Sequence, residues 1–114
     1  MMKVADLIEK MQLKVYSGQT GLDREITGGY VSDLLSDVMG NAAEGDVWIT
    51  LQTHQNVLAI ASLKEVAAVI LVKGRNPEAE TVVHSNEEGI PVLGTALGTF
   101  ECAGKLYKLL EEKN

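Results

Sequence analysis

The sequence predicts an α/β fold, a three-layer α/β/α sandwich with a mainly parallel sheet. From Asp46 onward, short runs of β-forming residues alternate with segments of helical periodicity, in the order strand, helix, strand, helix, strand, helix. Successive strands that are separated by a helix need crossover connections, so they should pair in parallel, with helices on both faces of the sheet. The chain of 114 residues has the length of one domain, and we expect residues 1–114 to form it.

The first third of the chain carries the same kinds of element at less regular spacing. Apolar residues from Val4 to Met11 recur at helical intervals, which predicts an amphipathic helix. A short strand is expected over residues 13–16 and a second at Tyr30–Val31. These two strands should join the sheet formed by the second half of the chain.

The next helix should carry Leu34 and Val38 and stop near Gly40–Asn41. Ser32 and Asp33 precede it and are residue types that commonly cap helix N-termini. We therefore expect these two residues to form its N-cap.

Three buried strands are expected in the second half, at residues 47–51, 68–72 and 90–93. Each is a continuous run of β-formers without polar alternation, as is typical of a sheet covered on both faces. Pro91 in the third run indicates either a strand start or an edge position, because proline cannot donate to the ladder.

Three helices should follow these strands. Thr53 is the expected cap of a helix over residues 54–65, and Pro77 suits the first turn of a helix that ends by Gly89. One face of the last helix is expected to present Phe100, Ala103, Tyr107 and Leu110.

The charge balance argues against two classes of partner. Sixteen acidic and ten basic residues give a formal net charge of −6, and no basic run is interleaved with aromatic residues. Neither nucleic acid nor an anionic membrane is expected to bind. The chain also has no apolar run of the roughly 18 residues that a membrane span needs, and no signal-peptide core. A soluble cytoplasmic protein is expected.

The sequence offers no arrangement of residues that is typical of catalysis or of metal or cofactor binding. A phosphate loop needs a lysine after its glycines, but Tyr30 follows Gly28–Gly29. Cys102 is the single cysteine, so an internal disulfide is excluded and a buried structural thiol is expected. His54 and His84 lack zinc-type spacing, and no GxSxG elbow frames a serine. We expect a protein that is not an enzyme and that binds no metal or cofactor.

Residues 23–29, DREITGG, are the least regular stretch of the chain. Its glycines permit positive φ and close approach of a ligand or another chain. The alternative is a tight turn into the next strand, with Asp23 and Arg24 paired to each other or holding the loop closed. The candidate ligand-binding residues of this loop are Asp23, Arg24, Thr27, Gly28 and Gly29.

The same residues carry a family resemblance. Together with the stretches YVSDLLSDVMG and GDVWITLQTHQN that follow, they resemble the DRTGG domain family, with Glu25-Ile26 interrupting the motif. The resemblance covers nearly the whole chain and implies a three-layer α/β/α domain similar to the N-terminal domain of HPr kinase/phosphorylase. Relatives are inserted in phosphotransacetylases and in pyrophosphatases that carry CBS domains. It implies a non-catalytic regulatory or assembly module.

A second candidate region is the row of residues that follow the three buried strands. Ligands of open α/β sheets usually bind beyond the carboxyl ends of the strands, where helix N-termini offer N–H groups to an anion. The candidate ligand-binding residues in this row are Gln52, Thr53, His54, Gly74, Arg75 and Thr95.

Two hypotheses about function follow. The first is a regulatory or assembly module that forms a homodimer and contacts protein partners of a metabolic or redox enzyme system, as the family resemblance implies. The alternative is a small-molecule sensor that binds a nucleotide or another anionic metabolite at the strand ends.

Overall fold

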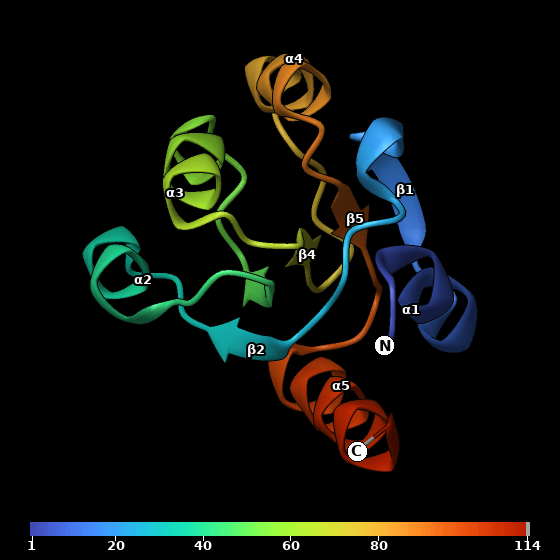
Figure 1. The fold of residues 1–114 in the computed structure, drawn as a ribbon. Coiled ribbons are helices and arrows are strands. Elements are labelled where there is room, and N and C mark those ends of the chain that lie inside the picture. Colours follow the sequence, from blue (N-terminus) through green and yellow to red (C-terminus); the bar gives the residue numbers. More distant parts are fainter. Residues whose placement is uncertain (114) are drawn as a thin grey trace.

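In the computed structural model, a five-stranded sheet separates two layers of helices (Figure 1), which confirms the predicted three-layer α/β sandwich. The structure describes residues 1–113. Its elements are, in chain order, α1 (Val4–Met11), β1 (Lys14–Ser17), the short 3₁₀ helix η1 (Gln19–Gly21), β2 (Gly28–Val31), α2 (Leu35–Asn41), β3 (Asp46–Thr50), α3 (Asn56–Lys64), β4 (Ala68–Leu71), α4 (Ala79–Glu88), β5 (Val92–Gly94) and α5 (Thr99–Lys113).

The strands lie in the order β1-β5-β4-β3-β2. The four strands β2 to β5 are parallel, and β1 pairs antiparallel with β5, so the sheet is mainly parallel as predicted. Pro91 lies directly before β5, and its carbonyl accepts the N–H of Val69 at 2.9 Å. The strand start predicted for Pro91 is confirmed, whereas the edge position is wrong because β5 lies between β1 and β4.

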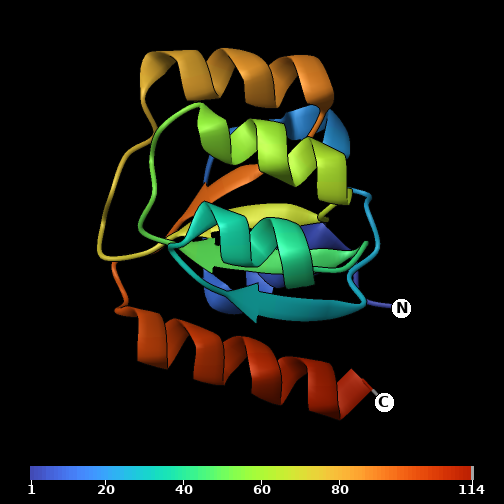
Figure 2. The same cartoon turned by 90° about the vertical axis from the view of Figure 1, so that its left-hand side faces the viewer.

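Alternation along the strands sorts the apolar side chains into two cores. Val47 and Ile49 of β3 contribute to the core under α1 and α5, whereas Trp48 between them belongs to the core under α2, α3 and α4. Figure 2 shows these layers, with α2, α3 and α4 above the sheet and α5 below it. The helices therefore cover both faces of the sheet, which explains why its strands are uninterrupted apolar runs.

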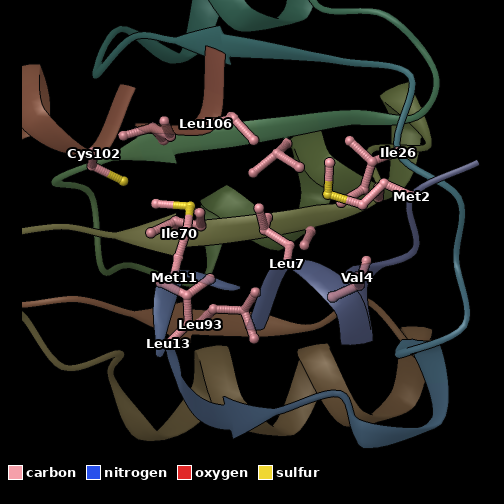
Figure 3. Packing of buried hydrophobic residues seen from close by; sticks show 14 of the residues in the cluster. Met2, Val4, Leu7, Met11, Leu13, Ile26, Ile70, Leu93, Cys102 and Leu106 are labelled. Carbon is pink, nitrogen blue, oxygen red and sulfur yellow. The ribbon is translucent and has the colours of Figure 1, made fainter. Parts of the chain in front are cut away.

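The core under α1 and α5 is built largely of aliphatic and sulfur-containing side chains. Figure 3 shows Leu7 of α1 and the α5 residues Cys102 and Leu106 converging on Ile70 of β4. Cys102 is fully buried, so the expectation of a buried thiol is confirmed.

The sheet-facing side of α5 differs from the predicted one. Phe100 is 90% exposed and Tyr107 is 67% exposed, so their predicted place on the buried face is wrong. The predicted Ala103 and Leu110 do pack against the core, which confirms that part of the face. The residues of α5 that pack there are Cys102, Ala103, Leu106, Leu109 and Leu110. These smaller side chains let the helix lie close to the sheet, and the aromatic residues are left outside.

The start of α2 is not capped as predicted. Its N-cap residue is Leu34, which makes no side-chain capping bond. The carboxylate of Asp33 instead accepts hydrogen bonds from the Thr50 hydroxyl at 2.9 Å and the Leu51 N–H at 2.6 Å, and the Ser32 hydroxyl accepts the Leu34 N–H at 3.1 Å. Asp33 thereby links the loop after β2 to the end of β3.

Two further predicted helix starts are also displaced. Because α3 begins at Asn56, Thr53 lies too far upstream to cap it. The Thr53 carbonyl instead accepts the Glu78 N–H at 3.1 Å and the Thr81 hydroxyl at 2.8 Å, which ties the loop after β3 to the start of α4. Pro77 lies just before the N-cap of α4, outside its first turn.

The parallel arrangement gives the sheet two distinct ends. Strands β2 to β5 all finish on one side, which is called the carboxyl end below, and start on the other, the amino end. In Figure 2 the carboxyl end lies to the left, and both labelled chain ends lie near the amino end at the right. Among residues 1–113, no helix combines the length and apolar character that crossing a membrane requires.

Candidate functional site

The structure separates the two groups of candidate residues. The DREITGG loop leads into the start of β2 and therefore lies at the amino end of the sheet. The other candidates follow β3, β4 and β5 and therefore lie at the carboxyl end. The two groups are distinct regions and do not form one combined site.

At the amino end, Arg24 is bonded to the end of α4. Its Nε donates to the Gly89 carbonyl at 2.9 Å and its second terminal nitrogen donates to the Glu88 carbonyl at 3.4 Å. A cation at these last carbonyls satisfies groups that the helix leaves unpaired and complements the helix dipole. The Arg24 carbonyl accepts the Val4 N–H at 3.0 Å, so the loop also holds the start of α1.

Asp23 and Arg24 were expected either to pair with each other or to hold the loop closed. Within residues 1–113, no carboxylate lies within 4.0 Å of the Arg24 guanidinium, so Asp23 is not its partner. Arg24 holds the loop closed through backbone carbonyls, which is the other alternative.

Thr27 fastens the same loop to the turn before β3. Its hydroxyl donates to the Glu44 carbonyl at 2.9 Å, and its N–H donates to the Gly45 carbonyl at 3.0 Å. Gly45 has a φ of +84°, and a Cβ there would overlap the Thr27 hydroxyl. The Thr27 side chain can therefore occupy this position only because residue 45 is a glycine.

The two glycines of DREITGG lie inside strand β2. Neither has a positive φ, so that expectation is wrong. A Cβ on Gly28 would lie 2.8 Å from the Asp46 carboxylate, and one on Gly29 would lie 2.9 Å from the Leu106 side chain. The close approach that these glycines permit is therefore to neighbours in their own chain.

A hollow of about 450 Å³ lies beside this loop. Arg24 and Thr27 contribute to its wall, together with the acidic residues Glu25, Glu44 and Glu65. Since the Arg24 guanidinium is already bonded to α4, the three carboxylates dominate the charge of this hollow. This arrangement disfavours an anionic ligand at the amino end.

At the carboxyl end, a hollow of about 430 Å³ includes two of the candidates, Gly74 and Thr95. It opens between the end of α1, strand β1, the loops after β4 and β5, and α5. Lys14, Tyr16 and Lys105 also line it. The sequence analysis missed these three residues, because only the antiparallel pairing of β1 with β5 brings Lys14 opposite the end of β5.

Backbone hydrogen bonds hold the loops around this hollow, defined here as the Lys14–Lys105 hollow. The Gly74 N–H donates to the Thr95 carbonyl at 2.9 Å, and the Lys73 N–H donates to the Leu97 carbonyl at 2.8 Å. The Thr95 hydroxyl accepts the Leu97 N–H at 3.2 Å. The loops that follow β4 and β5 therefore form one bonded wall.

Tyr16 forms another side of the hollow. Its hydroxyl donates to the Arg75 carbonyl at 3.1 Å, and the ammonium of Lys14 lies 4.8 Å from the centre of its ring. A Cβ on Gly94 would overlap this ring, so the glycine at the end of β5 is what lets Tyr16 lie there. The side chain of Arg75 is exposed and does not line the hollow.

The remaining candidates lie after β3, apart from this hollow. The Gln52 amide donates to the Asp33 carbonyl at 2.9 Å, and His54 Nδ1 accepts the Asn56 N–H at 3.1 Å. Thr53 is bonded to α4 through its carbonyl, as described above. The structure therefore gives these three residues local bonds and does not place them in the walls of the Lys14–Lys105 hollow.

A third hollow, of about 280 Å³, lies between α3 and α4 and is lined by Ser62, His84 and Glu88 among others. The Ser62 hydroxyl donates to the Glu88 carboxylate at 2.8 Å, while His84 Nε2 lies 3.0 Å from the Gln55 amide oxygen. Serine and histidine thus have different partners, and the pair does not form the bond that activates a nucleophile.

Among the titratable groups of the described residues, three have shifted pKa values. Burial raises the pKa of Cys102 to about 11, so the thiol is neutral at pH 7. The hydrogen bond to Asp37 raises the pKa of Tyr30, and stabilisation of the carboxylate by the hydroxyls of Ser32 and Tyr30 lowers the pKa of Asp37. These shifts follow from packing and from a link between β2 and α2, and none of the three groups lines the Lys14–Lys105 hollow.

No protein-family model matches the chain. It is 27% identical, over 128 aligned positions, to the HPr kinase/phosphorylase of Levilactobacillus brevis, in a match that covers 96% of this chain and 40% of that protein. It is also similar in structure to the CBS and DRTGG domains of the regulatory region of the Clostridium perfringens pyrophosphatase, crystallised with its activator diadenosine tetraphosphate. That likeness has a TM-score of 0.66 at 16% identity and covers 91% of this chain and 45% of the other. It shows a shared fold, and the chain spans less than half the length of either protein.

Proposed function

We propose that residues 1–114 form a DRTGG-type regulatory domain that catalyses no reaction itself and acts by binding a second copy of itself and protein partners. The observation that carries the proposal is an exposed apolar surface at the open edge of the sheet, on β2 and α5. The solved structure of similar fold belongs to the regulatory region of an enzyme, and the DREITGG loop serves to hold this fold together, both of which support a non-catalytic role.

The edge strand β2 supplies half of the proposed interface. The Ser32 N–H, directly after the strand, donates to the Ile49 carbonyl of β3. Because backbone groups alternate in direction along a strand, the groups of Val31 and Gly29 face the open edge. Two such edges related by a two-fold axis can pair antiparallel, which makes the strand complementary to its own copy.

Helix α5 supplies the other half, beside β2 in Figure 1. Val31 is 46% exposed, and Tyr107 across from it is 67% exposed. A shallow hollow of about 200 Å³ lies between β2 and α5 and is lined only by uncharged residues: Gly29, Tyr30, Val31, Ile49, Ala103, Leu106, Tyr107 and Leu110. The uncharged lining of this β2–α5 surface reduces the repulsion between two copies of a chain with net charge −6.

The similar proteins indicate what kind of system such a module serves. One is an HPr kinase/phosphorylase and the other a regulated pyrophosphatase, so both are larger enzymes of phosphate metabolism. We propose that this chain contacts protein partners in a comparable metabolic enzyme system, inside the cytoplasm.

Light scattering coupled to size-exclusion chromatography tests the self-association. The wild-type chain should elute with twice its 12.3 kDa mass. Val31→Asp and Tyr107→Asp should each shift it to the monomer, because each puts a charge on a surface that the dimer would bury.

Leu63→Asp is the matched control. Leu63 is 65% exposed on α3, away from the β2–α5 surface, so the same substitution should leave the dimer intact. A wild-type chain that remains monomeric at high concentration would contradict the proposal. So would a dimer that is disrupted equally by all three substitutions.

A further inference from the structure

We infer that the Lys14–Lys105 hollow is a binding site for a small phosphorylated metabolite. The phosphate would lie between the two lysine ammonium groups, and the organic part would lie on the apolar floor made by Met11 and Leu97. This goes beyond the proposed assembly role, because the hollow and the β2–α5 surface share no lining residue.

Two lysines at the hollow carry positive charge that no carboxylate neutralises. Within residues 1–113, neither Lys14 nor Lys105 has a carboxylate within 4.0 Å, although acidic residues outnumber basic ones sixteen to ten in the chain. Of the described residues that line the hollow, none is acidic. Two lysines of an acidic protein thus line one concave surface without a carboxylate partner, Lys14 lying only against the Tyr16 ring, and a dianionic phosphate would neutralise both.

Acidic residues are distributed unequally over the two ends of the sheet. More acidic residues lie at the amino end, including Asp23, Glu25, Glu44, Glu65, Glu87 and Glu88, than at the carboxyl end, where the loops and helix starts carry Asp33, Asp37, Glu78, Glu80 and Glu101. Lys73 and Arg75 lie in the loop after β4 at the carboxyl end, beside the hollow. An anion is therefore repelled less at the carboxyl end than at the amino end.

The Lys14–Lys105 hollow has the size and the fixed walls of a small-molecule site. Its volume of about 430 Å³ falls within the range of small-molecule sites, roughly 300 to 1,000 Å³. Its walls are fixed before any ligand arrives, by the bonds from Gly74 to Thr95 and from Tyr16 to Arg75. Because the wall is preformed, binding a ligand loses less conformational entropy in these loops.

The arrangement of polar and apolar groups defines the class of ligand. Lysines bind phosphate as point charges, whereas Met11, Leu97 and the Tyr16 ring offer contact to a carbon skeleton. Inorganic phosphate would use only the lysines. A sugar phosphate or mononucleotide would use both parts of the hollow and should therefore bind more tightly.

Isothermal titration calorimetry on the full chain tests this inference, with glucose 6-phosphate, AMP, ATP and inorganic phosphate as separate probes. At least one of the three organic phosphates should bind saturably, and more tightly than inorganic phosphate. Lys14→Gln and Lys105→Gln should each weaken that binding at least tenfold, because each removes one charge-assisted contact.

Lys108→Gln is the matched control, since Lys108 is exposed on the same helix as Lys105 but does not line the hollow. It should leave the affinity unchanged. The inference is overturned if none of the organic phosphates binds, if inorganic phosphate binds as tightly as they do, or if the three lysine variants lose affinity equally. Circular dichroism confirms that each variant is folded, and the light-scattering mass reports separately on the dimer.

Discussion

The two ends of the sheet use polar residues in opposite ways. At the amino end, the side chains of Arg24 and Thr27 donate hydrogen bonds to carbonyls of their own chain, and Gly28 and Gly29 lie close to neighbouring side chains. At the carboxyl end, Lys14 and Lys105 have no ion-pair partner within residues 1–113, and the loops around them leave a hollow. The DREITGG motif thus stabilises the fold, whereas Lys14 and Lys105, which belong to no sequence motif, have no carboxylate partner.

Glycine substitutions should show the largest difference between the two ends. Gly21 is buried at the amino end, where a Cβ would overlap the Gly89 carbonyl and lie 2.9 Å from Pro91, so Gly21→Ala should destabilise by about 3 kcal/mol. Gly98 follows β5 at the carboxyl end, where a Cβ would meet no atom within 4 Å, and Gly98→Ala should change stability by less than about 0.5 kcal/mol. Urea denaturation measures both. Equal losses of unfolding free energy in the two variants would contradict the proposed difference between the two ends of the sheet.

The two arginines provide a second, smaller contrast. Arg24→Ala should cost about 2 kcal/mol, because it leaves the last carbonyls of α4 without their charged donor. Arg75→Ala should cost less than about 0.5 kcal/mol, since its exposed side chain makes no described contact. The midpoints of urea unfolding compare them directly. If Arg24→Ala is as stable as the wild type, the amino end is not held together as described.

Lowering the pH should reduce the free energy of unfolding modestly, through the bond that joins Tyr30 of β2 to Asp37 of α2. The hydroxyls of Ser32 and Tyr30 lower the pKa of Asp37 in the folded state, so the ionised carboxylate favours folding. This contribution should be complete above the ordinary pKa of aspartate, near 4, and should be lost as the pH falls through the lowered folded pKa. Asp37→Asn should therefore be less stable than the wild type at pH 7 and should approach it near pH 3. A stability difference that stays the same at both pH values would contradict this link.

Cysteine labelling should show the smallest effect. Cys102 lies in the first turns of α5, near the carboxyl end, yet it is fully buried and burial raises its pKa to about 11. Ellman's reagent at pH 8 should leave the folded protein unmodified and react fully in guanidinium chloride. Rapid labelling of the folded chain would contradict this burial and would show that the reagent reaches Cys102 from the carboxyl end.

The fold was largely predictable from the sequence because its signals are local. The apolar spacing from Val4 to Met11 gave the limits of α1, and the continuous β-forming runs gave β3 and β4. The predicted caps were wrong where a distant partner competed for the same polar group. Asp33 bonds the end of β3 and Thr53 bonds α4, and neither partner is visible in the local sequence.

The candidate site was less predictable for the same reason. Gly74 and Thr95 could be named because they follow buried strands. Lys14 and Tyr16 lie on a strand whose direction and neighbour are set by the whole sheet. Lys105 lies on a helix whose predicted apolar face was correct at Ala103 and Leu110 and wrong at Phe100 and Tyr107.

Both labelled chain ends lie near the amino end of the sheet (Figure 2). In a fusion or an insertion into a longer polypeptide, both covalent junctions would therefore leave from that end. The Lys14–Lys105 hollow would point away from the host protein, and the β2–α5 edge would run along its flank. Such a module could be moved between proteins without its junctions blocking either surface.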